Sequence, residues 1–224
     1  MGTLVNAGSI LMGGALGGRV IPQMPENVRD GTVKALGLGT VLLGLQMAWK
    51  MQNALPILIS LALGTAAGEW IRIEERLEQA TAQLEKRLGG GPTQLSRAFV
   101  QASLLFCIGA MAITGSLQDG LKGDPSILYA KAVLDGAFSL MFSSVMGPGV
   151  ALSALPVLLY QGLLTLGASG VSHFLSPLVI SEVSATGGIM VMAIGTNLAG
   201  ATKIRVGNML PALLFVTLFL MLRH

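Results

Sequence analysis

Long apolar runs, separated by short polar stretches, are the dominant pattern along the chain. Helices that are apolar on every side and approach membrane thickness are typical of transmembrane segments, so each run predicts a spanning helix. The stretch VSHFLSPLVIS, residues 171–181, is apolar but short and broken by proline, which favours a re-entrant or interfacial helix and leaves the count at seven or eight spans. The eight runs cover residues 3–18, 33–49, 55–71, 99–116, 127–146, 150–168, 182–198 and 206–222.

Composition agrees with a membrane protein. Hydrophobic residues make up 52% of the chain and charged residues only 11%, whereas a soluble domain carries about 25% charged residues. We therefore expect an all-α, polytopic transmembrane helical bundle in which residues 1–224 form a single integral membrane domain. The first apolar run lacks a basic region before it, so we interpret it as a retained helix and not as a cleaved signal.

One strongly polar stretch, residues 72–98, interrupts the apolar pattern. Ile73, Leu77, Leu84 and Leu88 give it an apolar stripe, and charged residues cover the rest of the helical surface. This pattern predicts an amphipathic connector helix that lies against the membrane or against a partner subunit. A solvated connector helix explains the pattern equally well.

Lysine and arginine are distributed unevenly between the loops, and this distribution predicts the orientation. If the N-terminus lies outside, most basic loop residues fall on the cytoplasmic side, as the positive-inside rule requires. These residues are Arg19, Arg29, Lys34, Arg72, Arg76, Lys86, Arg87, Arg97, Lys203 and Arg205, against Lys50, Lys122 and Arg223 outside.

Two Ala-Leu-Pro runs, NALPILISLA from residue 53 and SALPVLLYQG from residue 153, point to an internal repeat. The segments that precede them also resemble each other, so residues 1–71 and 99–170 read as two copies of three helices, followed by C-terminal helices in residues 171–224. Three is an odd number, so the second copy enters the membrane from the opposite face. An inverted 3+3 helix repeat of this kind is typical of transporters that work by alternating access.

Polar residues inside an apolar run are costly and are therefore candidates for function. Lys131, Asp135, Ser139 and Ser143 follow one another at steps of four in residues 127–146, and on a helix they form one stripe. We expect Asp135 to serve in cation coupling or as a proton relay. Lys131 is either its ion-pair partner or a substrate anchor, and an internal pair near the outer surface is the structural alternative.

Uncharged polar residues in the other segments extend this candidate site. Gln161 and Thr165 lie four residues apart, and Asn6 and Gln101 occupy equivalent positions in the two repeats, where they could form a pair at the membrane centre. Helix–helix hydrogen bonding is the structural alternative for all of them. The predicted ion- or substrate-binding residues are Asp135, Lys131, Ser139, Ser143, Asn6, Gln101, Gln161, Thr165 and Asn197.

Motifs for soluble chemistry do not occur. The two histidines, His173 and His224, have no ligand-like spacing, so we expect no metal site. No nucleophile–base set, HExxH motif or phosphate-binding glycine loop occurs, which argues against an enzyme and against a cofactor. The net charge of +3 reflects loop orientation and does not predict nucleic-acid binding. Glu182 begins the segment 182–198, where a carboxylate favours a helix N-terminus.

The chain resembles the YqgA/YdfK-like family of bacterial inner-membrane proteins, which is defined by domain of unknown function 554. The stretches that carry this resemblance are GTLVNAGSILMGG, ASLLFCIGAMAITGSLQDGLKGD, LDGAFSLMFSS, ALPVLLYQG and GNMLPALL. The resemblance covers nearly the whole chain and implies a multi-pass protein of the bacterial cytoplasmic membrane. It implies no mechanism, although some members are loosely labelled as sodium channels or pumps.

Together these features favour a small transporter that moves an ion or small solute by cation-coupled alternating access. Because 224 residues are few for a transporter, we expect a homo-oligomer, most simply a homodimer, embedded in the lipid bilayer. Two other functions stay open: an oligomeric ion channel, with sodium as one candidate ion, and a non-transporting membrane scaffold or sensor that uses residues 72–98 as its partner surface.

Overall fold

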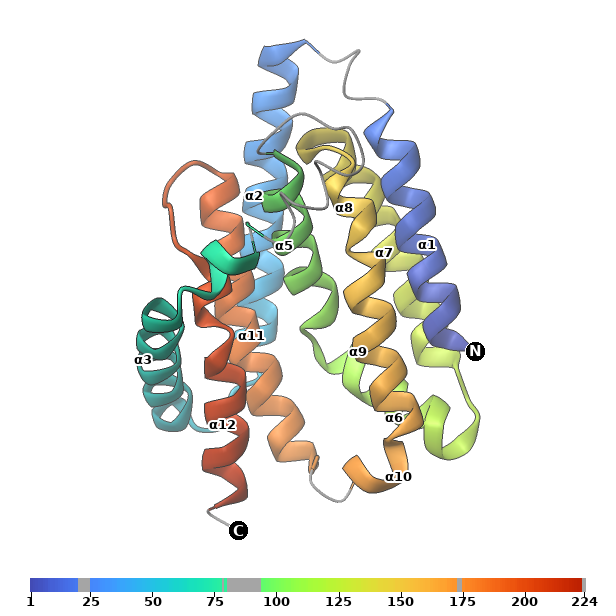
Figure 1. The fold of residues 1–224 in the computed structure, drawn as a ribbon, viewed down its shortest axis with the longest axis vertical. Coiled ribbons are helices and arrows are strands. Elements are labelled where there is room, and N and C mark those ends of the chain that lie inside the picture. The colour runs from blue at the N-terminus through green and yellow to red at the C-terminus, as the bar shows by residue number, and fades with distance from the viewer. Residues whose placement is uncertain (20–24, 78, 80–93, 173–174, 223–224) are drawn as a thin grey trace. The chain divides into compact units, whose positions relative to one another are not determined.

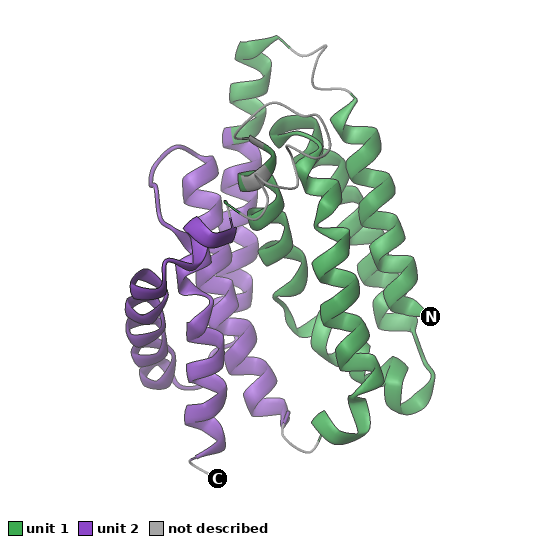
Figure 2. Ribbon diagram, in the orientation of Figure 1, with its two compact units in different colours: residues 1–33, 78–172 green, residues 34–77, 173–224 purple. Residues whose placement is uncertain are grey.

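A computed structural model describes residues 1–19, 25–77, 79, 94–172 and 175–222. Regular structure in these residues is entirely helical, and Figure 1 shows the helices in chain order. The chain divides into two compact units, coloured separately in Figure 2. Unit 1 contains residues 1–33 and 78–172, and unit 2 contains residues 34–77 and 173–224.

The helices of unit 1 agree with the predicted segments, with two exceptions. The segment expected at 99–116 is two helices that meet at an angle of 60°, and the segment expected at 150–168 is divided into three. Unit 1 consists of α1 (Gly2–Gly18), α5 (Gln94–Cys107), α6 (Ala110–Lys122), α7 (Ser126–Met146), α8 (Gly149–Leu152), α9 (Ala154–Leu166) and α10 (Ala168–Val171).

Glycines bring α1 and α7 into contact along their whole length. Gly2 at the start of α1 lies against Leu128 near the start of α7, and Gly17 at its end lies against the backbone of Leu140. The two helices therefore run in the same direction. A Cβ atom at Gly13 or Gly17 would overlap the α7 backbone, so only glycine permits this approach. We call the contact of Gly13 and Gly17 with Gly136 and Leu140 the glycine seam.

The other long helices of unit 1 run opposite to α1 and α7. Gly14, near the end of α1, faces Ala151 in α8, whereas Thr3 at its start contacts Thr165 near the end of α9. Gly120, near the end of α6, also lies against Thr165. The α5–α6 pair and the α8–α9 pair are thus parallel to each other and antiparallel to α1 and α7.

Unit 2 is built from antiparallel helix pairs. It contains most of α2 (Glu26–Ala48), with α3 (Ala54–Ile71), α11 (Pro177–Leu198), the 3-10 helix η2 (Val206–Met209) and α12 (Pro211–Met221). Gly37 of α2 faces Gly195 near the end of α11, and Gly44 faces Gly188 nearer its start. Gly64 of α3 faces Ala212 of α12 in the same close manner.

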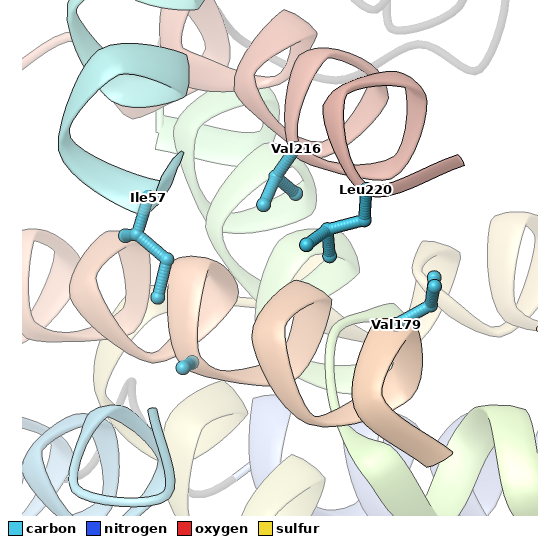
Figure 3. Close-up of a cluster of buried hydrophobic side chains, with 5 residues drawn as sticks. Ile57, Val179, Val216 and Leu220 are labelled. Atoms are coloured by element: carbon cyan, nitrogen blue, oxygen red, sulfur yellow. The ribbon is translucent and has the colours of Figure 1, made fainter. Parts of the chain in front are cut away.

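The apolar core of unit 2 lies between α3, α11 and α12. Ile57, Val179, Val216 and Leu220 are almost completely buried there, and Figure 3 shows their side chains gathered at the helix contacts. Ile57 is near the start of α3 and Leu220 is near the end of α12, which is the order expected for an antiparallel pair.

The three Leu-Pro runs each begin a helix. Pro56 and Pro156 are the third residues of α3 and α9, and Pro211 is the first residue of α12. Proline suits the first turn of a helix because the backbone N–H that it lacks has no intrahelical partner there. The repeated proline-led pattern therefore marks helix starts, as the sequence predicts.

Four described helices are long and apolar enough to cross a membrane, or five if the bent α5–α6 pair is counted as one span. They are Glu26–Ala48, Ala54–Ile71, Gly149–Leu166 and Pro177–Leu198. Large apolar side chains such as Leu58, Leu159 and Leu163 remain exposed on them, as expected for helices that face lipid. Trp49 and Trp70, at the ends of α2 and α3, are more than four-fifths exposed, which suits a membrane–water interface.

The expected connector helix at 72–98 lies mostly outside the described residues, because residues 78 and 80–93 are not described. Residues 73–77 are helical. Of the stretch 171–181, residues 177–181 form the first turns of α11 and are not a separate re-entrant helix. The segment expected from Glu182 therefore begins at Pro177.

Candidate functional site

The polar stripe of α7 is buried against α1. Lys131, Asp135, Ser139 and Ser143 are all less than 9% exposed, although each would be costly to place in apolar surroundings alone. The step of four residues keeps them on the face of α7 that forms the glycine seam. The sequence prediction that this face avoids lipid agrees with their burial.

Lys131 and Asp135 form a direct ion pair within α7. The Lys131 Nζ atom donates a hydrogen bond to Asp135 Oδ2 at 2.6 Å, and each side chain is 9% exposed. Of the two roles open for Lys131, the structure thus places it as the ion-pair partner of Asp135. Buried pairs of this kind contribute little net stability, because removing two charges from water offsets their attraction.

Asn6 joins this pair to two further helices. Its Nδ2 atom donates to Asp135 Oδ2 at 3.0 Å and to Gln161 Oε1 at 3.3 Å. Asn6 and Gln161 are completely buried. One connected group, Asn6 of α1, Lys131 and Asp135 of α7, and Gln161 of α9, therefore lies inside unit 1. We call these four residues the polar cluster.

The polar cluster has hydrogen-bonding capacity that no group in the described part of the chain meets. Among the described residues, Asn6 Oδ1 and Gln161 Nε2 are buried without a hydrogen-bond partner. Leaving such a group unsatisfied costs about 1–3 kcal/mol, so a purely structural network would be expected to pair them. The same is true of Gln101 Oε1 and Ser116 Oγ elsewhere in unit 1.

The two serines of the stripe have a structural role. Ser139 Oγ donates to the carbonyl of Ile10 at 2.7 Å, and Ser143 Oγ donates to the carbonyl of Gly14 at 2.6 Å. These hydroxyls bridge α7 to α1 across the glycine seam. They belong to the predicted stripe, but their described hydrogen bonds go to backbone carbonyl groups and not to the polar cluster.

The remaining predicted residues separate into three places. The Thr165 hydroxyl lies 3.4 Å from that of Thr3 and links α9 to α1. Gln101 of α5 is buried, but it forms no hydrogen bond with Asn6 among the described residues. The Asn6 amide nitrogen bonds Asp135 and Gln161, and both Asn6 Oδ1 and Gln101 Oε1 lack a partner. Asn197 lies in unit 2 and shapes the loop after α11 by bonding the backbone of Ile204.

A helix break lies near the polar cluster and was not expected from the sequence. Helix α5 ends at Cys107 and α6 begins at Ala110. Gly109 between them has a φ of 154°, a conformation that side chains other than glycine rarely permit. Helix α5 packs against α7, which carries the ion pair. A break of this kind frees backbone groups at the two helix ends that meet there.

Two further buried acids bind helix starts. Asp119 Oδ2 of α6 accepts hydrogen bonds from the Gly2 amide at 3.0 Å and from the Met1 amino group at 3.1 Å. In unit 2, Glu182 Oε1 accepts from the amides of Gln52 and Asn53 at 2.9 and 2.8 Å. Glu182 thus stabilises the N-terminus of α3, which corrects the expectation that it begins its own helix. In the sequence, a single carboxylate near the end of an apolar run is the feature that could have indicated each of these contacts.

No multi-residue metal centre is formed by the described residues, since no three His, Cys, Asp or Glu side chains gather among them. The oxygen atoms of the polar cluster are instead carboxylate and amide oxygens. Such ligands suit hard cations and water more than transition metals.

Comparison with known proteins identifies relatives across the full length. The family model "Protein of unknown function (DUF554)" matches residues 1–221. The chain is 30% identical over 219 residues to the uncharacterized protein YqgA of Escherichia coli strain K12, covering 96% of this chain and 93% of that protein. It is also 30% identical over 227 residues to the uncharacterized membrane protein YdfK of Bacillus subtilis strain 168, covering 100% and 96% respectively. No solved structure matches.

Proposed function

The chain belongs to the DUF554 family of proteins of unknown function, as its sequence motifs predict, and from this premise we propose that it is a small membrane transporter. It moves an ion or small solute across the bacterial cytoplasmic membrane by cation-coupled alternating access. The observation that carries the proposal is the buried Lys131–Asp135 ion pair, which Asn6 connects to Gln161 on a third helix.

A structural role explains this arrangement poorly. Replacing a buried ion pair by apolar residues of similar volume is often neutral or stabilising, and apolar residues are abundant throughout the chain. Ionisable residues inside membrane segments typically belong to ion pathways or proton relays. The Asn6 Oδ1 and Gln161 Nε2 atoms, which have no described hydrogen-bond partner, could bind an ion or a small polar solute in the polar cluster.

The helix directions within each unit are consistent with alternating segments, as the predicted topology of seven or eight spans requires. In unit 1, α1 and α7 run in one direction and the α5–α6 and α8–α9 pairs run in the other. In unit 2, α2 is antiparallel to α11, and α3 is antiparallel to α12. Consecutive segments that each cross the membrane once alternate in direction, and the pairs within each unit have the relative directions that this alternation predicts.

An inverted repeat supplies the physical basis for alternating access. Two similar helix triplets of opposite orientation have similar energies when they exchange conformations, so a central site can face either side. The common proline-led starts of α3 and α9 support this relationship. A homodimer gives so small a chain additional buried surface within the membrane.

The burial of the α7 stripe favours a transporter over a channel. A conducting pore needs a continuous polar path, whereas Ser139 and Ser143 bond α1 carbonyl groups. The polar cluster is therefore a local site enclosed between three helices, which is the arrangement expected of a carrier.

Flux measurements in proteoliposomes test the proposal. The purified protein is reconstituted, and uptake is followed for a panel of ions and small solutes under defined gradients. Saturable, gradient-coupled uptake is expected, and Asp135→Asn should reduce it at least tenfold. Asp124→Asn is the matched control, because Asp124 is an exposed acid of the α6–α7 loop that bonds Ser126 and Gln118.

A second variant controls for folding. Asp135→Asn combined with Lys131→Met removes both charges and leaves no unpaired ion, so it should fold and still lack transport. Size-exclusion chromatography reports folding of each variant. Full coupled uptake by this double variant, or non-saturating current from the native protein, would overturn the proposal.

A further inference from the structure

We propose that transport is an exchange of one small monovalent cation for one proton, in which the cation binds Asp135 and the proton leaves from Lys131. This inference rests on the proposed function and deepens it by naming the substrate class and the residue that carries the proton. The charge balance of the polar cluster carries it.

The charges of the polar cluster cancel. Lys131 contributes one positive charge and Asp135 one negative charge, and the other two members, Asn6 and Gln161, are neutral amides. All four are less than 9% exposed, so a net charge would be poorly solvated there. A monovalent cation that enters raises the net charge to +1. The cluster becomes neutral again only when it loses one proton.

Lys131 is the group whose proton is displaced, because it alone donates a charged hydrogen bond to the carboxylate that the cation needs. Its Nζ atom lies 2.6 Å from Asp135 Oδ2, so a cation that binds this oxygen must displace the ammonium group. The displaced ammonium would then face the cation inside the same buried site. Loss of its proton removes that repulsion.

The oxygen atoms around Asp135 determine the class of cation. Asn6 Oδ1 is buried without a partner, and Gln161 Oε1 already lies in the cluster through its bond with Asn6. Asn6 turns its Nδ2 atom toward Asp135 and Gln161. A half-turn of this amide brings Oδ1 to the Asp135 carboxylate and Gln161 Oε1, and together they offer a set of hard oxygen ligands, which suits alkali cations. A divalent ion would leave a net positive charge even after Lys131 becomes neutral, so charge balance selects a monovalent ion.

The exchange step balances in atoms and charge. The cation binds the Asp135 carboxylate, the Lys131 ammonium leaves it, and one N–H bond of Lys131 breaks. The electron pair stays on Nζ, and the proton passes to water on the side to which the site is open. Release of the cation on the other side reverses each change, so a complete cycle moves no net charge.

Other titratable residues on the helices around the Lys131–Asp135 pair serve as comparisons for the role of Lys131. Cys107 at the end of α5 and Tyr160 of α9 are two of these residues, and Asp119 of α6 is engaged at the start of α1. The charged residues Arg97 and Lys122 lie near the start of α5 and at the end of α6. None of these residues has a hydrogen bond to Asp135 among the described contacts. The proposal therefore expects Cys107→Ala and Tyr160→Phe to retain the exchange.

The test follows proton and cation movement together. Proteoliposomes that contain a pH-sensitive dye are exposed in turn to gradients of Na⁺, Li⁺ and K⁺, and a voltage-sensitive dye reports net charge. We expect proton movement opposite to that of at least one of these cations, at one proton per cation, with no voltage change. No proton movement with any of the three overturns the inference.

Two substitutions at Lys131 identify the proton carrier. Lys131→Arg keeps the ion pair but cannot give up its proton, so the folded variant should lose exchange at least tenfold. Lys131→Met should retain cation movement without proton release, and this movement should become voltage-dependent. Lys122→Met, at the exposed end of α6, is the matched control and should behave as the native protein.

The outcomes separate this inference from the proposed function. Native proton-to-cation stoichiometry in both Lys131 variants overturns the inference, while Asp135-dependent uptake still supports a transporter. Saturable uptake of an uncharged solute without any cation dependence overturns the inference and also the cation coupling in the proposed function. If the native protein shows no flux that Asp135→Asn reduces, the proposed function itself is overturned.

Discussion

The glycine seam between α1 and α7 gives a quantitative prediction for stability. Gly17→Ala places a Cβ atom over the Leu140 carbonyl oxygen, 3.0 Å from its carbonyl carbon and 3.0 Å from the Ser144 amide nitrogen. These neighbours are backbone atoms, so no side-chain rotation relieves the overlap, and the helices must separate. Separation also lengthens the hydrogen bond from Ser143 Oγ to the Gly14 carbonyl, which is 2.6 Å.

The expected cost combines two terms. Overpacking of a close contact costs about 1–3 kcal/mol, and weakening one buried neutral hydrogen bond costs about 0.5–1.5 kcal/mol. The free energy of unfolding of unit 1 should therefore fall by about 2–4 kcal/mol. For a chain of this length, about 2–4 °C per kcal/mol corresponds to a melting temperature lowered by roughly 5–15 °C.

Thermal unfolding in detergent measures this effect. Aliquots of purified protein are heated, and the fraction that remains monodisperse is determined by size-exclusion chromatography. Gly8→Ala is the control within the same helix, because a Cβ atom at Gly8 meets no other atom within 4 Å. It should melt at or slightly above the native temperature. Equal melting temperatures for Gly17→Ala and Gly8→Ala would show that the seam is not closely packed.

Three further predictions concern buried polar groups. Asp135→Leu should destabilise the fold by about 3–5 kcal/mol because Lys131 is left unpaired. Adding Lys131→Leu should recover most of this loss, which a double-mutant cycle of melting temperatures measures. Glu182→Gln should cost about 1–3 kcal/mol because charge-assisted bonds to the start of α3 are lost; an unchanged melting temperature would contradict this role. Asn197→Ala should release the loop after α11 and accelerate trypsin cleavage after Lys203, which gel electrophoresis detects. Unchanged cleavage would show that Asn197 does not hold this loop in place.

The central part of the candidate site could be predicted from the sequence. Helical periodicity placed Lys131 and Asp135 one turn apart, and the cost of charge in an apolar segment indicated that they are buried and adjacent. The same reasoning included Ser139 and Ser143 in the stripe. It could not show that these hydroxyls bond α1, because that contact depends on the distance between helices, which glycines on a different segment determine.

The breaks within the apolar runs were not predictable in the same way. Apolar residues continue on both sides of Gly109, so the run 99–116 appeared continuous, although the backbone changes direction there. A single glycine in a membrane segment more often permits packing than a bend. The sequence predicts that Glu182 lies at the start of a helix, and it does bind a helix start. That helix is α3, which is far away in the sequence.

The inverted repeat and the transporter function stay predictions. Similarity between residues 1–71 and 99–170 rests on a few matching residues in apolar segments. Asn6 and Gln101 form no hydrogen bond with each other in the described part of the chain. The relative directions of α1, α7 and α9 do not depend on such matches, since they follow from contacts between particular residues.

The glycine seam also determines which parts of unit 1 can move independently. Two backbones in contact, with hydroxyl bridges at successive turns, cannot slide or rotate without collisions, so α1 and α7 must travel as one rigid body. Asn6 and Asp135 belong to that body, whereas Gln161 is on α9. Spin labels on the lipid-facing sides of α1 and α7 should therefore report a constant separation throughout a working cycle, and a label on α9 should report the displacement.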